Sequence, residues 1–530
     1  MKKAGVKKII AVFVSAAMWG SLLSGCGSAP GTGKTSTGAE EGKKTLVIGS
    51  GQSAGTLDPI KAYNGWYPVR YGICQTLTKM NDDYSITGWL TENEYSSNED
   101  NTEWTFSIKD NVTFSNGNKL DAEAVKKSLE NVFENGERGV EYFTPVSIEA
   151  DGQKLVITTQ RPEPILPNKL ADPLFCIIDT SVDNSKIGDN GPIGTGPYVC
   201  ESFDAATKKC VVIKNQNYWN GEVKTDRIEF VYSEDQSTIS MGLQSGDFDA
   251  VYNVSMNDIG TFEKNNDYKI KTNPSGRTTI GFMNQNGALG DKVLREAVLQ
   301  MQDKDSYCKI LLKNQYVPGK TLITSASDYG YDTLTDPNVY NPENAKKLLD
   351  EAGYTDTDGD GFRETPAGEP LSLRFVYYTG RPEQQIVVEA AQAAMAKVGI
   401  KVTPEIHDTQ TVMDMQKTGD YDLLCMSINI MNCGDPENQI NTYFKKGGTY
   451  NATGYNSEEF NSLMEQVHVS ADPKQRKDLI KQAEQVLLND GAAIYFCYPI
   501  MNFVMKKHVD GINSTPADFY WVDENTTINQ

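Results

Sequence analysis

The chain has 530 residues, of which 38% are hydrophobic and 23% charged; this is ordinary globular composition, and the length suits two or more domains. The formal net charge of −21 and the isoelectric point near 4.7 argue against nucleic acid as a partner, since nucleic acid requires a basic face. An acidic surface also repels anions at long range, so any site for an anionic ligand has to be locally basic.

The first 26 residues have the pattern of an export signal. Four lysines among the first eight residues precede an apolar stretch, residues 9–23, and no later apolar run has transmembrane length. Leu23-Ser-Gly-Cys26 resembles a bacterial lipobox, in which Cys26 becomes the acylated N-terminus. The alternative is an ordinary secretory signal with an incidental cysteine. Residues 27–44 are rich in Gly, Ser and Thr and predict a flexible tether.

A strand and a small β-rich unit are predicted to follow the tether. Residues 45–49 form a short apolar strand, and residues 52–59 form a loop. Asp121 is placed to cap a helix over residues 122–133, whose apolar positions recur at helical spacing. Predicted strands lie around this helix at residues 103–109, 146–149 and 154–159. Together they predict a β-rich unit over about residues 80–185.

Glycine–proline clusters over residues 191–197 introduce a hairpin. Its strands are predicted at residues 198–203 and 211–213, because glycine and proline punctuate a chain sharply. A four-residue turn would place Cys200 opposite Val211, and a one-residue change would place it opposite Cys210. An exported protein can form disulfides, but buried free thiols explain the eight cysteines beyond Cys26 equally well.

The second half of the chain has the strand–helix–strand order of a parallel α/β sheet. Residues 275–284 are predicted to be a strand that crosses from the first half into the second. The elements expected after this crossover are a strand at 371–377, a helix at 383–398, strands at 400–406 and 420–426, helices at 457–470 and 473–489, and strands at 493–498 and 503–506.

Four short motifs together carry a family resemblance: FSNG at 114–117, GTGPY at 194–198, NQNYW at 215–219 and SGDFDAVY at 245–252. In this combination the chain after residue 45 resembles the peptide/nickel family (family 5) of extracellular solute-binding proteins, which deliver ligands to ABC importers. The resemblance implies a two-lobed, type II periplasmic-binding-protein fold. Lobe I would span residues 45–275 and include the β-rich subdomain, lobe II residues 276–504, and residues 505–530 would return to lobe I.

No catalytic constellation accompanies these motifs. The three histidines, His407, His468 and His508, stand in unrelated contexts, and no GxSxG, HExxH or Walker A motif occurs. We therefore expect no enzyme and no cofactor; a secreted hydrolase is the rival that the missing nucleophile–base pair argues against. Asp356, Asp358 and Asp360 resemble the start of a calcium loop, but Ala367 replaces the bidentate Glu, so an acidic turn is the better interpretation.

The candidate ligand-binding residues fall on loops at the expected cleft. Tyr63 and Trp66 would line its mouth or pack a helix over residues 69–76. Arg381, after Tyr377, lies at the carboxyl end of a strand, where open α/β sheets bind ligands. The resemblance implies that Arg138, which follows Glu137, binds ligand carboxylates; the alternative is a solvated arginine that pairs with Glu134 or Glu137.

The loop from Asn429 to Pro436 departs from both branches of the resembled family. Dipeptide-binding relatives have an Asp three residues before the Asp-Pro pair to hold the peptide ammonium, and here that position is Asn432. Nickel-type relatives with a histidine ligand have it where this chain has Ser427. Neither role is carried over, although Asp435 remains available to an ammonium if the loop is displaced.

These observations predict a monomeric, surface-anchored binding protein that closes its lobes on a small anionic solute, such as a metal held by a chelator. A dipeptide or oligopeptide ligand is the alternative, and a ligand-sensing receptor lipoprotein is a third. The expected partner is an ABC permease in the membrane. The anchor would be lipidated Cys26 on the outer face of the bacterial membrane, in the periplasm if the cell is Gram-negative.

Overall fold

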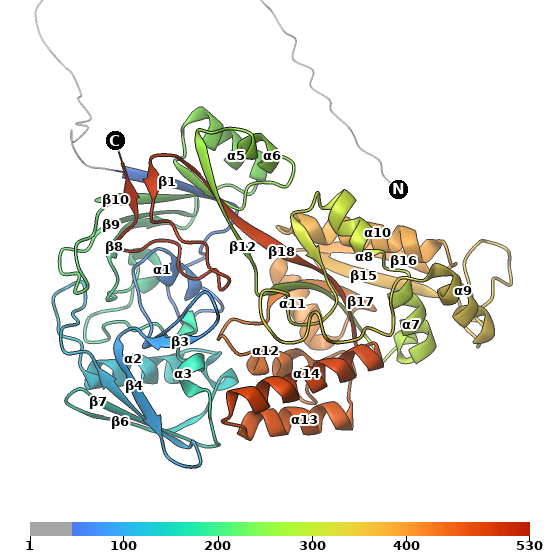
Figure 1. Ribbon diagram of the computed structural model, residues 1–530, viewed down its shortest axis with the longest axis horizontal. Helices are drawn as coiled ribbons and strands as arrows, with labels where there is room; N and C mark the ends of the chain where they lie inside the picture. Colours follow the sequence, from blue (N-terminus) through green and yellow to red (C-terminus); the bar gives the residue numbers. More distant parts are fainter. Residues whose placement is uncertain (1–44, 530) are drawn as a thin grey trace, which may run out of the picture. The chain divides into compact units, whose positions relative to one another are not determined.

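The structure is a computed structural model that describes residues 45–529, so the predicted signal, the tether and Cys26 lie outside it. A 12-stranded mixed sheet runs through the described residues (Figure 1). Its strands, in spatial order, are β16 (Lys401–His407), β15 (Ser372–Tyr378), β17 (Leu423–Asn429), β13 (Arg277–Met283), β18 (Ala493–Lys506), β11 (Ala250–Tyr252), β1 (Thr45–Ser50), β10 (Arg227–Tyr232), β9 (Lys209–Lys214) and β8 (Tyr198–Asp204), with β12 (Tyr268–Pro274) and β14 (Tyr316–Pro318) also pairing to β18.

Strand β18 joins the two halves of this sheet. Its first residues pair with β13 and β14, and its last residues pair with β11 and β12, antiparallel in every case. The sequence predicted two strands here, at 493–498 and 503–506, and this prediction was wrong. The backbone stays paired between them because Pro499 faces Tyr316 of β14, and residues 500–502 face the end of β12.

The parallel α/β arrangement predicted for the second half is confirmed. Strand β15 pairs in parallel with β16 and with β17, and helix α10 (Pro382–Ala396) packs on β15 and β16. The apolar face of α10 is buried at Val387, Val388, Ala391 and Met395, which explains why this long segment is helical. Strand β1 is likewise parallel to β10 and β11 in the first half.

The predicted β-rich unit is a separate four-stranded antiparallel sheet. Its strands, in spatial order, are β4 (Thr91–Ser97), β5 (Glu103–Ile108), β7 (Lys154–Thr159) and β6 (Pro145–Asp151). Trp104, Phe106 and Ile108 alternate inward from β5, as their period-two spacing predicts. Helix α2 (Ala122–Asn135) packs on β6 and β7, and the Asp121 side chain accepts a hydrogen bond from Ala124 N at 2.9 Å, which confirms the predicted cap.

The remaining elements cover the sheets and connect them. Short strands pair as β2 (Thr78–Met80) with β3 (Ile86–Gly88) and as β19 (Val509–Asp510) with β20 (Thr527–Ile528). The other helices are α1 (Trp66–Arg70), α3 (Leu166–Lys169), α4 (Ile187–Asn190), α5 (Gln236–Ser245), α6 (Ile259–Glu263), α7 (Lys292–Gln300), α8 (Lys304–Ser306), α9 (Pro342–Glu351), α10 (Pro382–Ala396), α11 (Thr409–Thr418), α12 (Glu437–Phe444), α13 (Glu458–Val469) and α14 (Pro473–Asp490).

The hairpin of β8 and β9 differs from its predicted register. An irregularity between Cys200 and Ser202 leaves Cys200 opposite Val212, and Cys210 opposite Phe203. All eight cysteines of the described residues are free thiols in the structure, and Cys200 alone among them is not fully buried.

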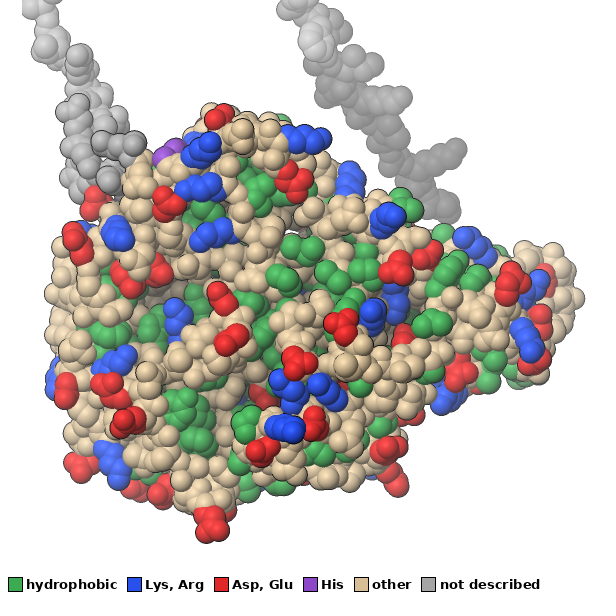
Figure 2. Space-filling model, viewed as in Figure 1, with side chains coloured by type: hydrophobic (Ala, Val, Ile, Leu, Met, Phe, Trp, Pro, Cys, Tyr) green, Lys and Arg blue, Asp and Glu red, His purple; other side chains and the backbone are tan. Residues whose placement is uncertain are grey.

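Surface charge is mixed on the face drawn in Figure 2, where acidic and basic side chains alternate without a large patch of one sign. Among residues 45–529, no helix has both the length and the apolar character that crossing a membrane requires.

Glu484 on α14 has an unusual environment for a carboxyl group. One of its oxygens accepts a hydrogen bond from Ile323 N at 2.7 Å, and the other has no partner among the described residues. Burial raises the pKa of Glu484 to about 8, so the folded protein holds this group protonated at neutral pH.

Glu484→Gln is expected to stabilise the protein on the alkaline side. The folded-state pKa lies above the unfolded one, so the native protein loses stability as the pH rises from about 4.5 to 8, and glutamine does not titrate. The gain in unfolding free energy should be on the order of 4 kcal/mol at pH 8 and vanish below pH 4. Urea unfolding at both pH values measures it, with exposed Glu369→Gln as the control. An equal effect at both pH values would contradict this assignment.

Candidate functional site

A cleft of about 490 Å³ lies at the ends of the strands of the large sheet. Its lining comes from the loop after β1, the loop and helix around α1, the turn after β15, the end of β17, and helices α11 and α12. Ligands of open α/β sheets bind at the carboxyl ends of parallel strands, and both β1 and β15 point their carboxyl ends here. The sequence did not predict α11 and α12.

Aromatic side chains form one wall of the cleft. Tyr63 and Trp66 meet edge to face with ring centroids 5.8 Å apart, and Trp66 packs on Phe519 at 5.2 Å. Further rings that line the cleft belong to Tyr67, Tyr232, Tyr378, Tyr443 and Tyr450. Such a wall excludes water from a bound solute and so strengthens electrostatic contacts inside.

Two arginines of the cleft have no carboxylate partner among the described residues. Arg381 follows Gly380, immediately before α10, and its guanidinium makes no hydrogen bond or ion pair there. Arg277 is 5% exposed, donates to Ser427 O at 2.9 Å and lies over the Trp66 ring at 5.6 Å. Burial, and next the positive charge of Arg381, lower the pKa of Arg277 to about 10. An anion between the two guanidiniums would relieve both effects.

Arg70 also lines the cleft, but its charge is neutralised. Its Nη2 lies 2.5 Å from Asp518 Oδ2, and its Nε donates to Asp518 O at 2.8 Å. The contrast leaves Arg277, Arg381 and Lys208, whose Nζ lies 4.5 Å from the Tyr232 ring centroid, as the cations of the described lining without an ion pair.

Three buried polar atoms of the lining also lack partners among residues 45–529. They are Ser427 Oγ, Asn432 Oδ1 and Gln416 Nε2. Buried polar atoms are nearly always hydrogen-bonded, so these three are available to a bound solute or its water.

The structure brings five of the predicted site residues to the cleft: Tyr63, Trp66, Arg381, Asn429 and Asn432. Tyr377 instead points into the core below the sheet, and its neighbour Tyr378 lines the cleft, because successive side chains of β15 face opposite ways. Asp435 lies outside the cleft, where both of its oxygens are 3.0 Å from nitrogens of Arg476.

Arg138 lies behind the aromatic wall rather than in the cleft lining. Its guanidinium carbon is 3.8 Å from the Tyr63 ring centroid, its Nε is 3.2 Å from Glu141 Oε2, and its Nη1 donates to Ala62 O. The predicted pairing with Glu134 or Glu137 does not occur. In this structure Arg138 holds Tyr63 in place, and it does not meet Arg381 across the cleft.

Sequence reasoning missed Arg277. It assigned residues 275–284 to a crossover strand and gave no role to the single charged side chain within it. An arginine that opens an otherwise uncharged strand between two halves of a sheet is a signal that was available, since such a charge needs a partner once buried.

The other polar candidates are remote from the cleft. The carboxylate oxygens of Asp356, Asp358 and Asp360 lie within 4.8 Å of one another on an exposed loop, and Asp356 accepts from the Gly359 and Gly361 amides. None of the three histidines lines the cleft.

Comparison with known proteins identifies the family. Residues 85–451 match the model for bacterial extracellular solute-binding proteins, family 5. The chain belongs to this family. The nickel-binding protein NikA of Staphylococcus aureus is 28% identical over 516 residues, covering 96% of this chain and 97% of that protein.

Solved structures show the same type II periplasmic-binding-protein fold. Staphylococcus aureus NikA in complex with Ni(L-His)2 matches with a TM-score of 0.79 and 27% identity over 92% of this chain and 100% of that one. Bacillus subtilis AppA, an oligopeptide-binding protein in complex with a nonapeptide, matches with a TM-score of 0.80 and 21% identity over 92% of this chain and 100% of that one. The chain is therefore a non-enzymatic, extracellular or periplasmic solute-binding protein of a peptide/nickel ABC importer.

Asn432 makes a polar contact between distant segments at the edge of the cleft. Its Nδ2 donates to Asp172 Oδ2 at 2.8 Å and to the Tyr142 hydroxyl at 3.2 Å, and all three side chains are buried. Nearby, Asn168 Nδ2 donates to Cys433 O at 3.1 Å. These bonds connect residues 142–172 to the loop after β17.

Asn432→Asp is expected to break this contact, because a second carboxylate would face Asp172 at hydrogen-bond distance. The unfolding free energy should fall by about 1–3 kcal/mol at pH 7, and the radius of gyration without ligand should increase. Urea unfolding and solution X-ray scattering measure the two effects. The exposed Asn456→Asp changes the charge equally and should leave both unchanged; identical behaviour of the two variants would refute the role of this contact.

Proposed function

We propose that the protein captures a small anionic solute, such as a metal ion wrapped by an organic chelator, for import. The observation that carries the proposal is the pair of cleft arginines, Arg277 and Arg381, without a carboxylate partner among the described residues. Burial and the nearby charge of Arg381 lower the pKa of Arg277 to about 10, so a ligand that supplies an anion beside it gains energy on binding. Arg381 makes no ion pair with the described residues, although Tyr378 and Glu383 raise its pKa. The NikA relative of Staphylococcus aureus was solved with Ni(L-His)2, a metal chelate, which supports the same class of ligand here.

The chelator, rather than the protein, would supply the metal ligands. The cleft lining contains no histidine, cysteine, aspartate or glutamate among the described residues, so the protein offers no strong metal donor. Guanidinium groups instead suit the carboxylates of a chelator, because their fork donates two parallel hydrogen bonds. The cleft volume of about 490 Å³ is in the range of small-molecule sites.

Peptide uptake is the second candidate, supported by the AppA fold match and by relatives that bind peptides. A peptide ammonium needs a buried anion. The two carboxylates at the loop after β17, Asp172 and Asp435, already have hydrogen-bond or ion-pair partners. Asp172 accepts from Asn432 and Tyr142, and Asp435 is paired with Arg476. A sensing receptor with the same fold is the third candidate, and neighbouring permease genes would argue against it.

Closure of two lobes around the solute completes the proposal. We place lobe I at residues 45–275 and lobe II at residues 276–504, with the C-terminal residues returning to lobe I. In support, Asp518 pairs with Arg70, and Trp521 packs on Tyr252 with centroids 4.5 Å apart. The rings of Tyr63, Trp66, Tyr67 and Tyr232 then come from lobe I, whereas both arginines without an ion pair in the described chain and the rings of Tyr378, Tyr443 and Tyr450 come from lobe II. Arg138 would act through Tyr63 as a positioning residue.

Calorimetry on nickel with L-histidine, nickel with citrate, and a dipeptide tests the proposal. Arg381→Met and Arg277→Met should each weaken binding of the nickel complexes by roughly 10- to 150-fold, the range for losing a hydrogen bond to a charged group. Arg138→Met should cause a smaller loss. Arg161→Met, an exposed arginine paired with Glu465, is the control and should bind normally. Tight dipeptide binding that is insensitive to Arg277→Met and Arg381→Met would refute the proposal in favour of peptide uptake.

Lipidation of Cys26 would anchor this protein to the outer face of the membrane. Cells fed a labelled fatty acid should incorporate label into the wild-type protein, and Cys26→Ala should reduce the incorporation to background, because the thiol is the acceptor. The control is Cys200→Ala, which removes a cysteine of the folded part and should keep the label. Equal labelling of wild type and Cys26→Ala would exclude this anchor.

A further inference from the structure

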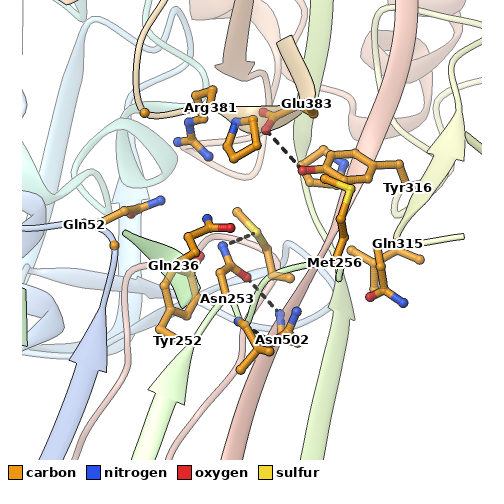
Figure 3. Close-up of a pocket in the computed structure, with 17 residues that line it drawn as sticks. Gln52, Gln236, Tyr252, Asn253, Met256, Gln315, Tyr316, Arg381, Glu383 and Asn502 are labelled. Carbon is orange, nitrogen blue, oxygen red and sulfur yellow. Dashed lines mark hydrogen bonds between the residues drawn. The ribbon is translucent and has the colours of Figure 1, made fainter. Parts of the chain in front are cut away.

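A small side chamber, drawn in Figure 3, adjoins the cleft at Arg381, which lines both. Its volume is about 70 Å³, and it shares Gln52, Gly380 and Arg381 with the cleft lining. Arg381 and Glu383 lie on one side of the chamber, and Gln236, Tyr252 and Asn253 lie opposite them (Figure 3). A liquid water molecule occupies about 30 Å³, so the chamber has room for an amino group and a carbon or two water molecules.

Glu383 is the one acidic side chain of this chamber. It is 2% exposed and lies in the first turn of α10; its Oε2 accepts a hydrogen bond from the Tyr316 hydroxyl at 3.1 Å. Its Oε1 has no hydrogen-bond partner among the described residues, and no Lys, Arg or His there makes an ion pair with it. The start of α10 thus leaves this buried oxygen without a hydrogen-bond donor among residues 45–529.

Other buried carboxylates of the described residues have partners, which makes Glu383 exceptional. Asp518 pairs with Arg70, Glu163 with Lys169, and Glu437 with both Arg476 and His468. Glu484 also lacks a basic partner, but it accepts from a backbone amide and is protonated at neutral pH. Glu383 makes no ion pair within the described part of the chain, although its charge helps to raise the pKa of nearby Arg381, and its unpartnered Oε1 belongs to a residue that lines a cavity.

Tyr252 also lines the chamber and is 2% exposed; burial, and next the charge of neighbouring Asp518, raise the pKa of its hydroxyl. It comes from β11 in the first half of the sheet, whereas Glu383 comes from α10 in the second. A donor group between them would therefore contact both halves.

We propose that the ligand is an amino-carboxylate, whose carboxylates bind Arg277 and Arg381 and whose amino group enters the side chamber and donates to Glu383 Oε1. This inference deepens the proposed function and rests on it. An amine carries N–H donors both when it is free and protonated and when it is coordinated to a metal, so the argument holds for an amino-acid chelate. A chelator built of carboxylates alone would leave Glu383 unpartnered and bring a like charge towards it.

Glu383→Gln is the decisive variant, because glutamine keeps the shape and can still accept from Tyr316 while it loses the charge. We expect it to weaken nickel with L-histidine and an unmodified dipeptide by at least about tenfold, and nickel with citrate by less than about twofold. Glu389→Gln, exposed on the same helix, should change none of the three. Unchanged citrate affinity also shows that the variant is folded.

The wild-type protein provides a test that needs no variant: it should bind nickel with L-histidine at least about tenfold more tightly than nickel with citrate. Equal affinities, together with no effect of Glu383→Gln, would overturn the side-chamber proposal and leave the chelate function intact. Dipeptide binding that depends on Glu383, with no binding of either nickel complex, would overturn the chelate function and retain the chamber. Binding of none of the three probes would overturn both.

Discussion

Main-chain pairing along β18 is the constraint on which the structure depends. This one continuous strand pairs with β13 and β14 of one half-sheet and with β11 and β12 of the other. Its residues 499–502 therefore fix how the two half-sheets lie relative to each other. Those four residues also line the side chamber, and Tyr316 of β14 and Tyr252 of β11 reach it from strands that pair with β18. The positions of Glu383 and Arg381 relative to Tyr252 therefore follow from backbone hydrogen bonds rather than from contacts between loops.

Local signals in the sequence predicted the parts of the fold that local physics decides. Asp121 forms its cap, the apolar face of α10 is buried, and β15 is followed by a turn that delivers Arg381 to the cleft. The failures have a different origin. Period-two alternation predicts that neighbours face opposite ways but does not say which of Tyr377 and Tyr378 faces the ligand, because the sheet's two faces are both covered.

Pairing over long sequence separations explains the remaining differences at the site. From the sequence, Asp435 was a candidate anion for a peptide ammonium. In the structure both of its oxygens accept hydrogen bonds from Arg476, which is 41 residues away in the sequence. Arg138 resembled a ligand-binding arginine, yet the ring that it covers is Tyr63, which no local pattern connects to it. To predict the role of Arg277 from the sequence, one would have to know which buried charges lack partners, and that is a property of the whole fold.

The aromatic rings and the arginines of the cleft come from different halves of the chain, and this has a consequence for release of the solute. Both free guanidiniums come from β13 and the start of α10, whereas the rings of Tyr63 and Trp66 come from the first half of the chain. Moving the rings away removes the Trp66 ring from Arg277 and lets water reach both guanidiniums. The attraction between unit charges 4 Å apart falls from about 4 kcal/mol at an effective dielectric constant of 20 to about 1 kcal/mol in bulk water. A permease that merely hydrates the cleft would thus discharge the solute without competing for any of its contacts.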